Sequence, residues 1–100
     1  MRALKASPSA EISSILVIDD DVLTIDFVRA ALAERPVTVS GAGDAESGLA
    51  AIRNERPGLV LLDLILPGAN GIELLEKIRE HDPETRVLVM TGQYSTESAV

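Results

Sequence analysis

Three short apolar runs, each ended by a polar side chain, constrain the fold of this chain more than any other feature. They occupy residues 15–18, 59–62 and 87–90 and consist of isoleucine, leucine, valine and one methionine. Runs of this length, rich in branched residues and without alternating polar positions, are typical of strands buried on both faces. We therefore expect three central strands of a sheet that helices cover.

The stretches between the apolar runs have the spacing of amphipathic helices, with apolar residues recurring every three or four positions. A residue type that favours helix N-caps precedes each of three such stretches: Asp21, Asp44 and Asn70. Pro36 and Asp82-Pro83 mark the ends of the first and third helices.

A fourth strand is predicted at residues 37–40, where apolar and polar residues alternate as they do at the edge of a sheet. We interpret Gly41-Ala42-Gly43 as the turn that follows it. Strands that alternate with helices of this length form a parallel sheet with right-handed crossovers. The expected fold class is α/β, a doubly wound parallel sheet, whose ligands bind beyond the carboxyl ends of the strands.

Composition excludes several classes of protein. The 100 residues suffice for one domain, and residues 1–12 are expected to be a flexible leader ahead of it. The absence of cysteine excludes disulfide scaffolds and thiol catalysis. A net charge of −7 and only two aromatic residues disfavour direct contact with nucleic acid. No apolar run approaches the roughly 20 residues that span a bilayer, so we expect a cytoplasmic protein without membrane contact.

Acidic residues follow two of the predicted strands. Asp19, Asp20 and Asp21 come after the strand predicted at residues 15–18, and Asp63 comes after the strand predicted at residues 59–62. If these strands are neighbours, carboxylates converge, and two of them about 4 Å apart repel by roughly 4 kcal/mol at an effective dielectric of 20. A divalent cation would relieve this repulsion, and such ligands suit Mg²⁺, with Mn²⁺ also accepted. The alternative is that the acids only cap helices and end strands, which we favour for Asp21.

A metal ion beside a carboxylate at a strand end indicates phosphoryl chemistry. Asp63 is ionised at neutral pH, so it can attack a phosphoryl group in line without a general base. Thr91 follows the last strand and offers a hydroxyl to the phosphoryl oxygens. For this threonine, a local hydrogen bond to the backbone is the alternative.

Three motifs, in their order and spacing, resemble the receiver domain of two-component response regulators. They are residues 15–21 (ILVIDDD), 61–71 (LLDLILPGANG) and 87–92 (VLVMTG). The resemblance covers residues 13–100 and implies a flavodoxin-like receiver fold. It also implies a signalling domain, with at most slow self-catalysed phosphorylation and dephosphorylation, rather than an enzyme. Residues 90–100 look most like receivers of enhancer-binding transcription activators, which indicates transcription regulation.

The resemblance implies a role for each residue of the site. Asp63 would be the phosphoacceptor, taking its phosphoryl group from a phosphohistidine on a sensor histidine kinase or a phosphotransfer protein. Asp20 would bind Mg²⁺ directly and Asp19 largely through water. The backbone carbonyl of Ile65 would be the third protein ligand, and Thr91 would be the switch hydroxyl.

The chain departs from the receiver pattern toward its C-terminus. Receivers have a fifth strand, ending in a lysine that pairs with the phosphoryl group, and a fifth helix, and neither Lys5 nor Lys77 is placed for that role. We therefore expect a truncated receiver that lacks both elements and is impaired in switching. Without the fifth helix, an apolar patch at Val17, at Val60 or at their neighbours on the same face of the sheet would promote a homodimer or a swapped assembly.

Two other functions remain open at this point. A phosphorylation-independent pseudo-receiver would act only as an interaction module; the missing lysine favours it, and the intact acids oppose it. A phosphatase with an aspartate nucleophile would need a second aspartate two positions after Asp63, where Ile65 cannot transfer a proton.

Overall fold

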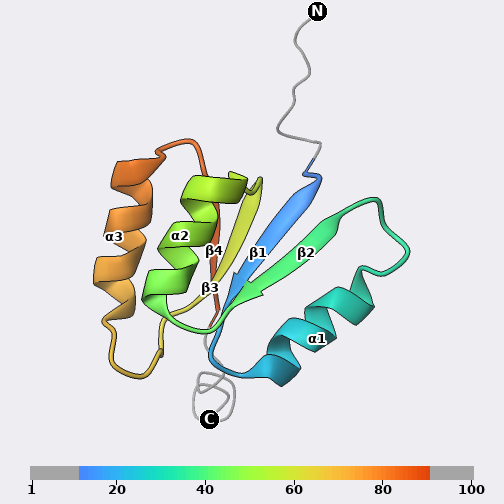
Figure 1. The fold of residues 1–100 in the computed structure, drawn as a ribbon, viewed down its shortest axis with the longest axis horizontal. Coiled ribbons are helices and arrows are strands. Elements are labelled where there is room, and N and C mark those ends of the chain that lie inside the picture. Colours follow the sequence, from blue (N-terminus) through green and yellow to red (C-terminus); the bar gives the residue numbers. More distant parts are fainter. Residues whose placement is uncertain (1–11, 91–100) are drawn as a thin grey trace, which may run out of the picture.

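A computed structural model describes residues 12–90 as a four-stranded parallel sheet with three helices (Figure 1). The strands lie in the order β2-β1-β3-β4, and their bounds are β1 (Ser14–Ile18), β2 (Thr38–Ala42), β3 (Leu59–Asp63) and β4 (Arg86–Met90). The helices are α1 (Val22–Ala31), α2 (Ala45–Glu55) and α3 (Gly71–His81). The predicted doubly wound α/β fold is confirmed, and residues 12–90 contain neither a fifth strand nor a fifth helix.

Two of the predictions fall outside this range. The leader lies there except for Ile12, and so does Thr91. Within the range that the structure describes, no helix is both long enough and apolar enough to cross a membrane.

The main core lies between the sheet and the helices α2 and α3, which cover the same side of it (Figure 1). Parallel pairing places Leu16 beside Val60 and Ile18 beside Leu62, and all four side chains are fully buried. Fully burying one such side chain stabilises the fold by about 1.5–3 kcal/mol. From the helices, the core receives Ile52, Leu74 and Ile78. This packing fixes β1 against β3, the pair of strands that carries the acidic residues.

Helix α1 packs on the opposite face, where β2 is longer than predicted. Gly41 and Ala42 are the last residues of β2 rather than part of a turn, because they pair with Val17 and Ile18 of β1. The glycine at 41 also lets α1 approach, since a Cβ there would lie 2.7 Å from Cδ1 of Ile25. The alternation of residues along the chain does not reveal this pairing, which depends on the neighbouring strand.

The prediction of an uncovered apolar patch is wrong for Val17 and Val60 themselves, because both are fully buried. It is confirmed for a residue on the same face as Val17: Leu88, which pairs with Leu61 in the neighbouring strand, is 58% exposed. Val17 pairs with Leu61, whereas Val60 pairs with Leu16, so the two valines lie on opposite faces of the sheet.

Strand β4 is less buried than its composition predicts. Leu88 is 58% exposed and Val89 is 39% exposed, so the prediction that this run is buried on both faces is wrong. The physical reason is the position of β4 at an edge: it pairs with β3, and among residues 12–90 no strand pairs with its other side. Helix α1 packs against β2, at the opposite edge of the sheet.

Candidate functional site

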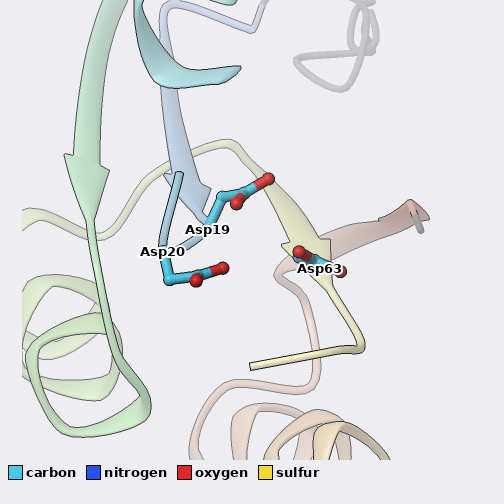
Figure 2. Close-up of side chains that lie close together, drawn as sticks. All are labelled: Asp19, Asp20 and Asp63. Atoms are coloured by element: carbon cyan, nitrogen blue, oxygen red, sulfur yellow. The ribbon is translucent and has the colours of Figure 1, made fainter. Parts of the chain in front are cut away.

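Three carboxylates meet at the carboxyl ends of β1 and β3. Asp19 and Asp20 directly follow β1, Asp63 is the last residue of β3, and the two strands are neighbours in the sheet. Figure 2 shows the side chains of Asp19 and Asp20 directed toward Asp63. One carboxylate oxygen from each residue lies within 4.8 Å of the other two. In the part of the chain that the structure describes, this is the one acidic or histidine cluster with such spacing.

Backbone hydrogen bonds hold Asp19 in place. Its amide donates to the carbonyl oxygen of Ala42 (2.9 Å), which extends the pairing of β1 with β2 by one residue. Its Oδ1 accepts a hydrogen bond from the amide of Asp21 (2.8 Å), and the residue is only 6% exposed. Asp20, by contrast, is exposed to solvent. The cluster therefore combines one buried, oriented carboxylate with one that faces water.

Asp63 is held in place by hydrogen bonds of the two residues that follow it, Leu64 and Ile65. Its Oδ1 accepts a hydrogen bond from the amide of Ile65 (3.0 Å), and the amide of Leu64 donates to the carbonyl of Met90 (3.3 Å) in β4. Among residues 12–90, Ile65 supplies the one backbone amide that donates to this carboxylate, whose other near neighbour is the carboxyl group of Asp19. One oxygen of Asp63 is thus fixed and the other is free to react or to bind a ligand.

The electrostatics of the cluster are unfavourable without a cation. Partial burial of the Asp63 carboxyl raises its pKa, and the charges of Asp19 and Asp20 raise it further, against a lowering by the hydrogen bond from Ile65. Like charges that are brought together in this way favour either protonation or a bound cation.

The donor set fits Mg²⁺. The carboxylates open into a cavity of about 430 Å³, which is also lined by Asp21, Thr24, Ile65, Leu66 and Pro67. Two oxygens bound to one Mg²⁺ ion at about 2.1 Å lie no more than about 4.2 Å apart. The observed limit of 4.8 Å is close to that value, so a small side-chain rotation or one bridging water closes the difference. Mg²⁺ usually retains several waters, for which the cavity has room.

The residues named from the sequence are placed as follows. Asp19, Asp20 and Asp63 come together, and Ile65 lines the same cavity. Asp21 lines the cavity too, but its carboxylate caps α1 by accepting a hydrogen bond from the amide of Leu23 (2.9 Å), as predicted.

Sequence reasoning missed Thr24, whose side chain lies in the first turn of α1 and lines the cavity. Its position three residues after the N-cap places it on the turn nearest the acidic cluster, and helical spacing from Asp21 is the signal that could have found it.

Known proteins resemble this chain in sequence and in fold. The family model of the response regulator receiver domain matches residues 15–100. The chain is 34% identical over 87 residues to the probable transcriptional regulatory protein TcrX of Mycobacterium tuberculosis, covering 87% of this chain and 37% of TcrX. It spans less than half the length of the curated relatives that it matches.

Solved structures agree with the fold and its connectivity. A CheY-like response regulator receiver domain protein from Methanospirillum hungatei superposes with a TM-score of 0.77 at 36% identity, covering 89% of this chain and 71% of that protein. NtrX from Brucella abortus gives a TM-score of 0.76 at 38% identity, covering 88% of this chain and 20% of NtrX.

Proposed function

Because this chain belongs to the family of response regulator receiver domains, we propose that it accepts a phosphoryl group on Asp63 in a Mg²⁺-dependent reaction. Receiver domains of this family are signalling domains rather than classical enzymes, and their partners are sensor histidine kinases or phosphotransfer proteins. The observation that carries the proposal is the convergence of Asp19, Asp20 and Asp63 within 4.8 Å at the edge of the sheet where α/β proteins bind ligands.

In the proposed reaction, the free Oδ2 of Asp63 attacks the phosphorus atom of a phosphohistidine. The new O–P bond forms as the P–N bond breaks in line, and the imidazole leaves with the bonding electrons and takes up a proton. Asp63 needs no general base, since a carboxylate is ionised at neutral pH. The amide of Ile65 holds the other oxygen of Asp63, which orients Oδ2 for the attack.

Asp19, Asp20, Asp63 and the backbone carbonyl of Ile65 would hold the metal ion. When bound, Mg²⁺, or Mn²⁺ in its place, supplies positive charge against the carboxylates and the phosphoryl oxygens. Asp20 would be a direct ligand and Asp19 would act largely through water. The burial of Asp19 and the exposure of Asp20 support this division, because the exposed carboxylate can move toward an incoming ion.

Thr91 completes the proposal as a hydroxyl donor to the phosphoryl group. The support from the described part of the chain is the pairing of Met90, the residue before it, with Asp63.

A small phosphodonor tests the proposed function directly. Incubation with phosphoramidate and Mg²⁺ should add the mass of one phosphoryl group, measured on the intact protein, and EDTA should prevent the addition. Asp63→Ala should abolish the gain, whereas Asp26→Ala, which removes an exposed carboxylate outside the cluster, should retain it. A gain that persists in Asp63→Ala would refute the assignment of the acceptor, and no gain in the wild type would favour the pseudo-receiver.

The cellular setting follows from the proposed partner. A sensor kinase presents its phosphohistidine in the cytoplasm, so we place the domain there, as the control domain of a transcription regulator. The net charge of −7 supports a role in which this domain does not itself contact DNA.

A further inference from the structure

The turn between β1 and α1 carries three consecutive aspartates, and the last of them has no role in the proposed reaction. We propose that Asp21 is a positioning residue that orients Asp19. The cap that it forms at the start of α1 would hold its backbone amide in the position from which that amide binds the Asp19 carboxylate. The proposal rests on the proposed function in one respect, namely that the cluster of Asp19, Asp20 and Asp63 binds Mg²⁺.

Asp21 takes part in hydrogen bonds on both of its sides. Toward the cluster, its backbone amide donates to Oδ1 of Asp19 (2.8 Å). Toward the helix, its Oδ1 accepts from the amide of Leu23 (2.9 Å), and its carbonyl accepts from the amide of Thr24 (3.0 Å). Its backbone is extended, with φ −96° and ψ 110°, as an N-cap requires. The same backbone conformation therefore caps α1 and aims the amide at Asp19.

The partner of this amide is the buried member of the cluster. Asp19 is 6% exposed, and a buried carboxylate needs hydrogen bonds to offset its lost hydration. Among residues 12–90, the amide of Asp21 is the one backbone donor that reaches this carboxylate, whose other near neighbour is the carboxyl group of Asp63. The bond leaves Oδ2 of Asp19 as the oxygen available for a cation or for its water ligands.

Asp21 itself is not part of the cluster. Its carboxylate oxygens do not belong to the group that lies within 4.8 Å, although the residue lines the same cavity. One of its oxygens is engaged by the helix, which keeps that atom directed toward α1. We therefore assign Asp21 to the positioning of a ligand and not to ligation.

This assignment separates the effect of the cap from the effect of the charge. Asparagine caps helices as well as aspartate does, so Asp21→Asn keeps the turn and removes only the charge. Its Mg²⁺ affinity should fall by less than that of Asp21→Ala, because the Asp21 carboxylate is exposed to water and is not one of the clustered ligands. Asp21→Ala removes the cap, and its Mg²⁺ affinity should fall by about tenfold, as for other residues that orient a metal ligand.

Asp44→Ala is the matched control. Asp44 caps α2 through the same kind of bond, from the amide of Ser47 (2.8 Å) to its Oδ1, and it does not line the acidic cavity. The change removes one charge and one helix cap, as Asp21→Ala does, and it should leave the Mg²⁺ affinity unchanged. Should Asp21→Ala fail to fold, Asp21→Gly replaces it, because glycine lacks the capping side chain but costs only a few tenths of a kcal/mol at an N-cap.

The affinities are measured by titrating the metal-free proteins with MgCl₂ and following amide shifts by NMR. A second readout needs no metal: the amide of Asp21, bonded to a carboxylate, should resonate downfield and be protected from exchange in the wild type and in Asp21→Asn, but not in Asp21→Ala. Equal losses of affinity in Asp21→Asn and Asp21→Ala would assign the effect to charge and overturn the proposal. So would an equal loss in Asp44→Ala, which would assign it to general destabilisation.

Failure of the proposed function gives a different pattern. A wild-type protein that does not bind Mg²⁺ would refute the metal site. The proposed positioning of Asp19 is then tested by the NMR signal of the residue 21 amide alone. Loss of the downfield shift in Asp21→Ala, with retention in Asp21→Asn, supports the proposed positioning. An unchanged shift in Asp21→Ala overturns the proposed positioning.

Discussion

Asp63→Asn should make the metal-free domain more stable, although it removes the proposed phosphoacceptor. Asparagine has the shape of aspartate and can still accept the hydrogen bond from the amide of Ile65, so the main change is the loss of one negative charge. That charge lies within 4.8 Å of a carboxylate oxygen of Asp19 and of Asp20. The free energy of unfolding should therefore rise when it is removed.

The size of the rise can be bounded from the geometry. At a separation of 4.8 Å, one pair of charges repels by about 3.5 kcal/mol at an effective dielectric of 20 and by about 0.9 kcal/mol in bulk water. The exposure of Asp20 and the partial exposure of Asp63 place the site nearer to the second value. We expect a gain of about 1–2 kcal/mol, which corresponds to about 4–8 °C in Tm for each kcal/mol in a domain of this size.

The gain should depend on pH in a defined direction. The raised pKa of Asp63 means that the folded wild type binds its proton more tightly than the unfolded chain does. Below the ordinary carboxyl pKa of about 3.9, Asp63 is protonated in both states, and wild type and Asp63→Asn should be alike. As pH rises through the raised pKa of Asp63, the wild type loses this contribution, and the advantage of Asp63→Asn should grow to its full value.

The assay is urea unfolding in EDTA at low salt, at pH values from 3.5 to 7.5, with Glu76→Gln as the control. Glu76 is exposed on α3 and lies outside the acidic cluster, so its replacement makes the same change in net charge without relieving the cluster. Mg²⁺ at ten times its Kd should then stabilise the wild type by about 1.4 kcal/mol and close the gap between the two proteins. Equal stabilities of Asp63→Asn and Glu76→Gln in EDTA at pH 7.5 would refute the argument.

Four further predictions concern packing and backbone conformation. Gly71→Ala should destabilise the domain by about 1–3 kcal/mol, measured by urea unfolding, because a Cβ at this position collides with the carbonyl oxygen of Leu64, next to Asp63; a neutral result would show that α3 can shift. Arg56→Gly should raise stability by about 0.5–1 kcal/mol, measured by thermal unfolding, since Arg56 ends α2 with a left-handed φ of 50° that glycine adopts without strain; a lower Tm would contradict it. Leu88→Ser should change stability by no more than about 0.5 kcal/mol and should weaken any self-association seen by sedimentation velocity, because Leu88 is 58% exposed. In contrast, Leu62→Ala in the core should cost about 2–5 kcal/mol.

Local features of the sequence were sufficient to predict the helices and strands and to single out the acidic residues of the candidate site. The helix caps at Asp21, Asp44 and Asn70 are where the residue types predict them, because a cap is a bond between a side chain and a backbone amide two or three residues away. The positions of Asp19 and Asp63 at strand ends follow equally from short runs of apolar residues. Their resemblance to receiver motifs then gave the family, which the comparisons confirm.

The tertiary structure decided what depends on neighbours far along the chain. The pairing of β1 with β3 brings Asp63 beside Asp19, and this adjacency is set by long-range packing rather than by local pattern. Pairing with β1 makes Gly41 part of strand β2. The position of β4 at the edge of the sheet exposes Leu88 to solvent, although the apolar run that contains it predicts a buried strand. An amide at Asp21 that orients Asp19 was likewise invisible in the sequence, since every residue other than proline carries the same donor and only the folded turn aims it.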